Sequence, residues 1–434
     1  MVAVLTVGTL NRVMIVELGV FAWLVALMVA LPLAVAPLRA LIGLRSDLHR
    51  SFLGWRRVPY IWGGTWLQFG GLAIMPFALI LLAGETSLQV WVGRAAAAAA
   101  FLLVGAGAQT VQTAGLALAT DLAPEHTRPR VVALMYVMLL VGMVGSGIVF
   151  SLLLADYSHT RLAQVVQGAA VATMVLNLVA LWKQEPRTSL RRPGEAASVV
   201  TGKSFRAHWQ KLAQRGRAPR FLLAVGLGTL AFNMQDIILE PYGGEILGMP
   251  VGDTTLLTGF MSVGALLACA LAARRLARGS DPHAVAAWGA VVGLVAFAAV
   301  ALSAPMQAPW LFRTGTTLIG FGAGLFAVGT LVAAMALDEG DGMHGLAIGA
   351  WGAVQATCAG AAIALGGALR DIVGGLAQAG ALGEALVGAG TGYGFVYHVE
   401  LALLFATLVV IGPLVRKTRR PATGQRFGLA EFPG

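Results

Sequence analysis

The stretch that decides the fold reads GAGAQTVQTAGLALATD at residues 105–121, because GAGLFAVGTLVAAMALD at residues 322–338 repeats it. The two stretches agree at eight positions: Gly105/Gly322, Ala106/Ala323, Gly107/Gly324, Val111/Val328, Thr113/Thr330, Ala117/Ala334, Ala119/Ala336 and Asp121/Asp338. Apolar segments rich in glycine and alanine match easily by chance, so the threonine and aspartate pairs carry most of the weight. Equivalent positions in two parts of one chain predict two parallel, structurally repeated halves.

The composition places these halves in a membrane. The chain has 434 residues, of which 58% are hydrophobic and only 12% are charged, whereas ordinary soluble domains carry about 25% charged residues. The first apolar segment lacks a basic leader and an A-x-A cleavage site, so we expect it to remain in the mature chain. Cys269 and Cys358 both lie in apolar runs, where we expect them to pack as small residues rather than to form a disulfide or bind a metal.

Apolar runs of the length that a membrane requires recur along the chain. A transmembrane helix needs about 20 apolar residues, and the sequence contains twelve candidates. They lie at 1–18, 20–43, 58–83, 93–118, 131–154, 161–182, 220–241, 255–273, 283–303, 311–337, 345–368 and 395–415. The first is short and carries polar residues, so we expect the natural chain to begin upstream and the first helix to be truncated here.

The basic residues are concentrated in alternate connections between these spans. Of 30 lysines and arginines, 25 lie in such connections. The connections are 39–57, 128–130, 183–220, 274–278 and the tail from Arg416. This positive-inside pattern predicts that both termini and the long central linker are cytoplasmic. The net charge of +10 then reflects topology and does not indicate nucleic-acid binding.

A polar, basic stretch in the middle of the chain divides the spans six and six. The predicted parts are an N-terminal half at 1–182, a cytoplasmic linker at 183–219, a C-terminal half at 220–415 and a basic cytoplasmic tail at 416–434. The predicted fold class is therefore an all-α membrane protein of twelve transmembrane helices in two pseudo-symmetric halves. This is the architecture of major facilitator transporters.

The loop between the second and third spans, RSDLHRSFLGWRRVPY, resembles a loop motif of that superfamily, in which an aspartate, a glycine and paired basic residues follow one another. An aspartate near a helix N-terminus and arginines at neighbouring helix ends can hold the cytoplasmic ends together as a latch. The alternative is a basic loop that serves topology alone. The residues assigned to the latch are Asp47, Gly54, Arg56, Arg57, Asp121 and Arg128.

The seventh span carries polar residues at membrane depth. It runs into FNMQDIILEPYGGEILG at 232–248. There Asn233, Asp236 and Glu240 would share an arc of about 60° on one helical face. A charged aspartate near the bilayer centre costs about 2.5–3.5 kcal/mol, so Asp236 either faces a functional cavity or bonds a neighbouring helix. Glu240 lies next to Pro241, where we expect the helix to end, and is either interfacial or functional.

The first span repeats this pattern with Asn11 and Glu17, and Arg12 between them could neutralise Asp236 or Glu240 across a central cavity. The other polar side chains at membrane depth are Gln68, Gln109, Gln112, His398 and Glu400. The glutamines either join helices or contact a substrate. The histidine, which stands beside two tyrosines, is either an interfacial residue or a metal ligand.

Four segments together resemble one family. They read LNRVMIVELGV, GWRRVPYIW, TAGLALATDLAPEHTRPRVVALMYVMLLVGM and FNMQDIILEPYGGEILG. They are similar to the PucC/LhaA family of phototrophic bacteria, and the resemblance covers nearly the whole chain except the N-terminus. It implies a membrane assembly factor that binds bacteriochlorophyll and delivers it to light-harvesting antenna polypeptides, or helps to assemble them. It also implies bacteriochlorophyll synthase as a further partner and the bacterial inner or intracytoplasmic photosynthetic membrane as the location.

Under this resemblance the polar residues of the spans are candidates to contact pigment, and His398 is the candidate axial ligand of the bacteriochlorophyll magnesium. The sequence has no phosphate-binding glycine loop, HExxH motif or Ser/His/Asp set, so we do not expect an enzyme. The alternative function is a secondary transporter that moves an organic solute by alternating access and couples to protons through Asp236 or Glu240. The fold alone cannot choose between these functions.

Overall fold

The structure is a computed structural model, and it describes residues 1–34, 55, 57–83, 90–124, 127–182, 184, 218–336 and 344–415. All regular secondary structure in these ranges is helical. The α-helices are α1 Leu10–Arg12, α2 Ala22–Ala34, α4 Val58–Leu82, α5 Val90–Leu122, α6 Arg128–Leu153, α7 His159–Leu181, α9 Ala218–Asn233, α10 Leu239–Glu245, α11 Val251–Ala277, α12 Pro282–Ser303, α13 Pro309–Met335, α14 His344–Gln378 and α15 Gly390–Ile411. Two π-helices, η1 Val4–Thr9 and η2 Val13–Glu17, flank α1. The 3₁₀ turns are η4 Met234–Ile237, η5 Glu384–Leu386 and η6 Gly412–Leu414.

Ten helices in the described ranges are long and apolar enough to cross a membrane. This confirms the predicted multi-pass, all-α membrane protein. The first predicted span is a continuous helical segment made of η1, α1 and η2, and α2 is a shorter apolar helix whose predicted span 20–43 is described only as far as residue 34. The predicted tail 416–434 and nearly all of the predicted linker 183–219 lie outside the described residues.

The helices begin where local chemistry favours a helix start. Proline stands in the first turn of α4, α6, α12 and α13, where its missing N–H removes no helical hydrogen bond. Ser158 caps α7 by accepting the backbone N–H of Arg161 at 3.1 Å. Asp281 caps α12 in the same way, accepting from His283 at 3.0 Å. Turn chemistry in the sequence therefore delimits these spans.

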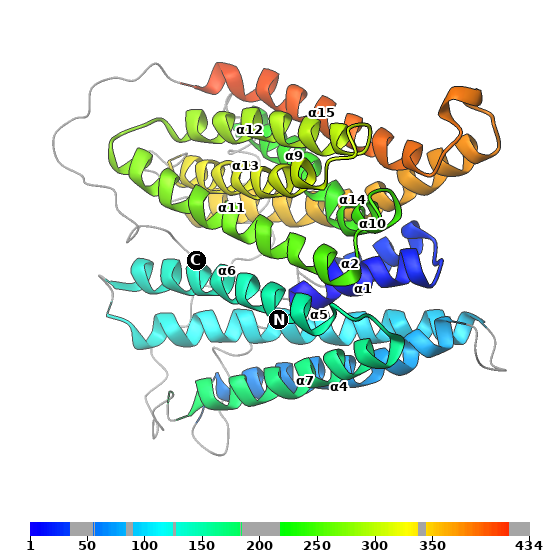
Figure 1. The fold of residues 1–434 in the computed structure, drawn as a ribbon. Coiled ribbons are helices and arrows are strands. Elements are labelled where there is room, and N and C mark those ends of the chain that lie inside the picture. Colours follow the sequence, from blue (N-terminus) through cyan, green and yellow to red (C-terminus); the bar gives the residue numbers. More distant parts are fainter. Residues whose placement is uncertain are drawn as a thin grey trace, which may run out of the picture.

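The helices form two layers that lie side by side (Figure 1). One layer contains α4, α5, α6 and α7, and the other contains α9 to α15, with the first segments of the chain between them at one end. α6 packs against α11, and α2 packs against α14, so the two layers are joined along both flanks. Of the repeated stretches, 105–121 falls on the C-terminal part of α5 and the residues 322–335 fall on that of α13, one in each layer.

Close packing requires glycine where α11 meets α13. A Cβ atom at Gly264 would lie 2.0 Å from the carbonyl oxygen of Thr317, and one at Gly320 would lie 2.0 Å from that of Met261. A side chain at either position would force the two backbones apart. The glycine-rich stretch 320–324 is therefore a packing surface of a membrane helix, as small residues usually are in such bundles.

The seventh span differs from the continuous helix that the sequence predicts. α9 ends at Asn233, the 3₁₀ turn η4 follows, and α10 begins at Leu239. Asn11 of the first span donates from Nδ2 to the backbone carbonyl of Asp236 at 3.2 Å, which satisfies one carbonyl at the break. The expectation that Pro241 ends the helix is wrong. It lies in the first turn of α10, where a proline is tolerated.

Candidate functional site

The break in the seventh span is lined by buried polar groups. Gln235 is fully buried, and its Nε2 donates to Oδ1 of Asp236. Asn11 is fully buried as well. The amide oxygens of both residues, Oδ1 of Asn11 and Oε1 of Gln235, have no hydrogen-bond partner among the described residues. The break therefore gathers unpaired oxygen acceptors beside the carboxyl group of Asp236, which is partly buried.

Glu240 lies one turn further along and has a bonded carboxyl group. Its Oε1 accepts a hydrogen bond from the hydroxyl of Thr258 on α11 at 2.9 Å. The same carboxyl lies against Gly8 of η1, where a Cβ atom would approach Oε1 to 3.3 Å. With 3% of its surface exposed, Glu240 is held between the first span and α11 rather than solvated at the end of its helix.

Glu400 of α15 brings a third acid to this region. Its side chain is fully buried, and neither carboxyl oxygen forms a hydrogen bond of good geometry in the described ranges, although the backbone of Gln235 lies near the carboxyl. It lies within electrostatic range of Asp236, which interacts in turn with Glu240. No lysine or arginine in the described part of the chain forms an ion pair with any of the three. We call Asp236, Glu240 and Glu400 the acid cluster.

Arg12 has a different partner from the one that the sequence suggested. Its Nη1 lies 2.6 Å from Oε1 of Glu17, five residues along the same segment. Its Nη2 donates to the carbonyl oxygen of Met249 at 3.2 Å. The hypothesis that Arg12 neutralises Asp236 or Glu240 is therefore wrong, because its guanidinium group is already paired with Glu17.

The glutamines singled out in the sequence lie in the N-terminal layer. Gln68 of α4 is 4% exposed and packs against Gly107 of α5. Gln109 of α5 has a buried Oε1 without a partner in the described ranges, whereas Gln112 is exposed on the same helix. Asn233 donates from Nδ2 to a carbonyl of its own helix. The helix break thus brings together Asn11, Asp236, Glu240 and Glu400, and not the glutamines.

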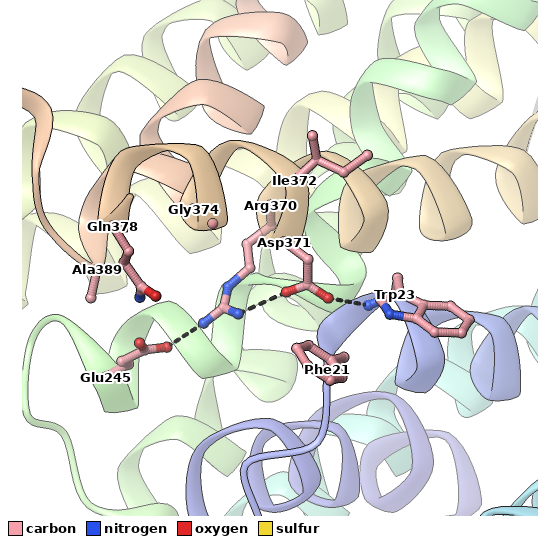
Figure 2. A pocket seen from close by; sticks show the side chains of 10 residues that line it. Phe21, Trp23, Glu245, Arg370, Asp371, Ile372, Gly374, Gln378 and Ala389 are labelled. Carbon is pink, nitrogen blue, oxygen red and sulfur yellow. Dashed lines mark hydrogen bonds and ion pairs between the residues drawn. The ribbon is translucent and has the colours of Figure 1, made fainter. Parts of the chain in front are cut away.

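A second polar cluster, which sequence reasoning missed, lies at the end of α10 (Figure 2). Arg370 of α14 lies 2.7 Å from Glu245 and 2.8 Å from Asp371. Arg370 also donates to the hydroxyl of Tyr393 at 3.0 Å, and that hydroxyl donates to Glu245 at 2.6 Å. Asp371 accepts the backbone N–H of Trp23, at the start of α2, at 2.8 Å. We call these residues the arginine network.

The arginine network borders a pocket of about 340 Å³ between α14, the end of α10 and the start of α2. The available signal in the sequence was the charged pair at 370–371, which follows an apolar run. The predicted span 345–368 stops before this pair, whereas α14 continues to Gln378. A charged pair at the end of an apolar run is typical of a helix end, so the sequence predicts that these residues lie outside the span.

The predicted loop latch is described only in part. Nε of Arg57, at the start of α4, lies 3.1 Å from Oδ2 of Asp121, near the end of α5. The described part of the chain does not include Asp47, Gly54 or Arg56, nor the side chain of Arg128. The latch as a whole stays a prediction.

His398 and Glu400 lie on different faces of α15. His398 is exposed, and its Nδ1 lies 2.6 Å from the carbonyl oxygen of Gly394. Because a carbonyl oxygen only accepts, Nδ1 carries the proton, and the lone pair of Nε2 in the neutral ring has no partner among the described residues. No group of three or more His, Cys, Asp or Glu side chains in those ranges is arranged to hold a metal ion.

Comparison with known proteins identifies the family. The family described as PUCC protein matches residues 9–419. The chain belongs to the PUCC family. Its PUCC relatives include a Rhodobacter capsulatus protein named for its place in the puhA-bchM intergenic region, which is 51% identical over 439 residues that cover 100% of this chain and 91% of the relative. Protein PucC of Rhodovulum sulfidophilum is 56% identical over 379 residues, with 86% and 82% covered. The bacteriochlorophyll synthase 44.5 kDa chain of Rhodobacter capsulatus is 31% identical over 431 residues, with 97% and 93% covered.

Solved structures show which fold this PUCC protein has. A bacterial homologue of the iron transporter ferroportin, in an inward-facing state, superimposes with a TM-score of 0.64 at 15% identity, covering 96% of this chain and 97% of that one. The D-xylose-proton symporter gives a TM-score of 0.62 at 15% identity, with 96% of both chains covered. At this identity the similarity establishes the fold alone. The major facilitator architecture predicted from the internal repeat is confirmed.

Proposed function

We propose that this protein serves the photosynthetic apparatus by binding bacteriochlorophyll on the outer face of α15 and delivering it to light-harvesting antenna polypeptides within the membrane. Membership of the PUCC family supports this proposal, as does the 31% identity to a protein named as a bacteriochlorophyll synthase chain. The single structural observation that carries it is the orientation of the His398 ring.

The exposed imidazole has the features of an axial ligand for the magnesium of a bacteriochlorophyll. A histidine that ligates a metal generally donates its other ring N–H to a carbonyl or carboxylate, which fixes the tautomer and the ring plane. In His398 the carbonyl oxygen of Gly394 accepts this hydrogen bond, at 2.6 Å from Nδ1. Nε2 then faces outward with its lone pair free. The residue lies eight positions after Gly390, or about 12 Å along α15, at a depth where water is scarce.

The surface around His398 suits a flat, apolar ring system. Phe395, Ala402, Phe405 and Val409 are exposed on α15 at helical spacing from the histidine, so all five share one outward stripe. Phe395 is 43% exposed and Phe405 is 64% exposed. Between them, Ala402 leaves room above the backbone. Bound there, the pigment would supply the magnesium for Nε2 to ligate, and this chain would supply the ligand and the apolar bed.

The same proposal covers location and partners. A ligand on the outer face is reached sideways through the bilayer, where a membrane-embedded antenna polypeptide could approach it. The charge pattern supports a cytoplasmic position of both termini in the inner or photosynthetic membrane. Binding and delivery need no chemical step, so the protein acts as a carrier and assembly factor rather than as an enzyme.

The test is the absorption spectrum of the full-length protein purified in mild detergent from a phototrophic host, with extracted pigment quantified per chain. We expect about one bacteriochlorophyll in the wild type, its loss in His398→Leu, and partial retention in His398→Asn, whose amide oxygen can still ligate magnesium. The matched control is His159→Leu, which removes an exposed histidine at the start of α7. A colourless wild type, or pigment that persists in His398→Leu, overturns the proposal.

One observation favours a second function, transport of an organic solute coupled to proton entry. No lysine or arginine of the described residues forms an ion pair with the acid cluster, and ionisable groups inside a membrane commonly mark transport pathways. A colourless preparation that copurifies with neither antenna polypeptides nor the synthase would leave this as the better account.

A further inference from the structure

We propose that the helix break in the seventh span is a binding site for a monovalent alkali cation of the size of Na⁺. The site would draw its ligands from the first span, from the break in the seventh span and from α15. They are the side-chain oxygens of Asn11, Gln235, Asp236 and Glu400. This inference goes beyond the pigment role, since it concerns the interior of the bundle, while His398 lies on the outer face.

Four of the unpaired side-chain atoms in this region are oxygen acceptors. Oδ1 of Asn11, Oε1 of Gln235 and both oxygens of Glu400 are buried without a hydrogen-bond partner among the described residues. Leaving a buried acceptor unsatisfied costs about 1–3 kcal/mol, so four such atoms in one region require an explanation. A single bound cation would give all four oxygen atoms a partner.

The bonds and contacts that these residues form place their side chains around Asp236. The amide nitrogen of Asn11 donates to the Asp236 carbonyl, and that of Gln235 donates to the Asp236 carboxyl, so both amides converge on one residue. Each amide thereby leaves its oxygen unpaired beside Asp236. Glu400 approaches the same residue from α15. Glu240 is left out of the ligand set because it lies one turn further along, where its carboxyl is held between Thr258 of α11 and Gly8 of the first span.

The composition of this set favours a metal cation over a proton. A protonated carboxyl offers a single O–H donor and can satisfy one amide oxygen, whereas one cation can contact several oxygen acceptors at once, and here amide and carboxyl oxygens occur together. Hard cations prefer such oxygen ligands. Interrupted membrane helices are also where transporters of several folds hold coupling ions. A divalent ion is disfavoured, since no group of three or more acidic, histidine or cysteine side chains in the described ranges is arranged to hold a metal.

Charge balance supports the same conclusion. The arginine nearest in sequence to the break-lining residues of the first span, Arg12, is paired with Glu17. None of the other ion pairs in the described ranges reaches the acid cluster. An ionised carboxylate at this depth costs about 2.5–3.5 kcal/mol. One bound monovalent cation balances one of the two carboxyl groups in the ligand set, and the other is neutral when it carries a proton.

The experiment measures saturable binding of radioactive sodium to the full-length protein in detergent, with choline chloride holding the ionic strength constant. We expect saturable binding to the wild type that potassium displaces weakly. Asp236→Asn and Glu400→Gln should each lower the affinity at least about tenfold. Asp253→Asn, which alters an acid paired with Arg313 on the surface, is the control and should leave the affinity unchanged.

Three results would overturn the site. They are absence of saturable sodium binding to the wild type, binding that survives both variants, and a thermal stability that responds to pH but not to sodium. The wild-type measurement decides the matter even where a variant fails to fold. Because it does not depend on pigment, a negative result here leaves the His398 proposal standing, and the reverse also holds.

Discussion

The arginine network should be the most strongly coupled polar group in the described part of the chain, and a double-mutant cycle can measure that coupling. The perturbations are Arg370→Met, Glu245→Gln and the two together. Arg370 makes charge-assisted contacts with Glu245 at 2.7 Å and Asp371 at 2.8 Å, and its side chain is only 20% exposed. Its removal leaves two acids at the same spot without their cation.

The expected magnitude follows from that geometry. Removing one partner of a buried ion pair costs about 3–5 kcal/mol. The partial exposure of Arg370, 20%, and of Glu245, 29%, places the change at the lower end, about 3 kcal/mol. The double variant should be less destabilised than the sum of the single variants, by about 2 kcal/mol, because the second change removes an acid that the first had stranded.

The assay is unfolding of the purified protein in mixed detergent micelles, followed by circular dichroism. The comparison cycle is Arg313→Met with Asp253→Asn. That pair is 42% and 41% exposed, so its coupling should be only about 0–1 kcal/mol. Single-variant effects at Arg370 and Glu245 that add to within about 0.5 kcal/mol would refute the reasoning, since they would show that the two side chains act independently.

Three further predictions concern other parts of the fold. Gly264→Ala would set a methyl carbon 2.0 Å from the carbonyl oxygen of Thr317, and we expect a fluorescent fusion to elute as aggregate on size exclusion; a monodisperse peak would mean that α11 and α13 separate easily. Burial raises the pKa of Tyr157 to about 12. The stability that this phenol contributes is complete below its unfolded pKa of about 10 and is lost as the pH rises through the folded pKa, so the absorbance difference between wild type and Tyr157→Phe should titrate near pH 12. Titration near the unfolded pKa would contradict the burial of the phenol. Thr258→Val removes the donor to the carboxyl of Glu240 and should lower the free energy of unfolding by about 1–3 kcal/mol, whereas an unchanged value would show that the carboxyl finds another donor.

The spans and their two-layer arrangement could be predicted because their causes are local. A run of apolar residues, a proline in the first turn and a basic connection each act over a few positions of the chain. The match between residues 105–121 and 322–338 then predicted that the two halves of the chain repeat one structure. The first span was also expected to carry polar residues into the bundle, and Asn11 does bond the seventh span.

The break at Asn233 could not be predicted, because its cause is not local. The residues Asn-Met-Gln-Asp are compatible with a helix, and the turn is held by Asn11, which is 225 residues away in the sequence from Asp236. The same reason hid the arginine network, whose partners Arg370 and Glu245 are separated by 125 residues. The prediction for Arg12 failed for the opposite reason, because its partner Glu17 lies in the same segment, whereas the predicted partners were the distant acids Asp236 and Glu240.

The contact between Trp23 and Asp371 bears on how the protein is made. The first turn of α2 has free backbone N–H groups, and one of them is satisfied by a carboxylate that is synthesised 348 residues later. During synthesis, the start of α2 therefore lacks this hydrogen bond until α14 has been inserted into the membrane. The layer that leaves the ribosome first is completed last, and an N-terminal half expressed alone should stay more susceptible to proteolysis at the start of α2 than the same half expressed together with its C-terminal partner.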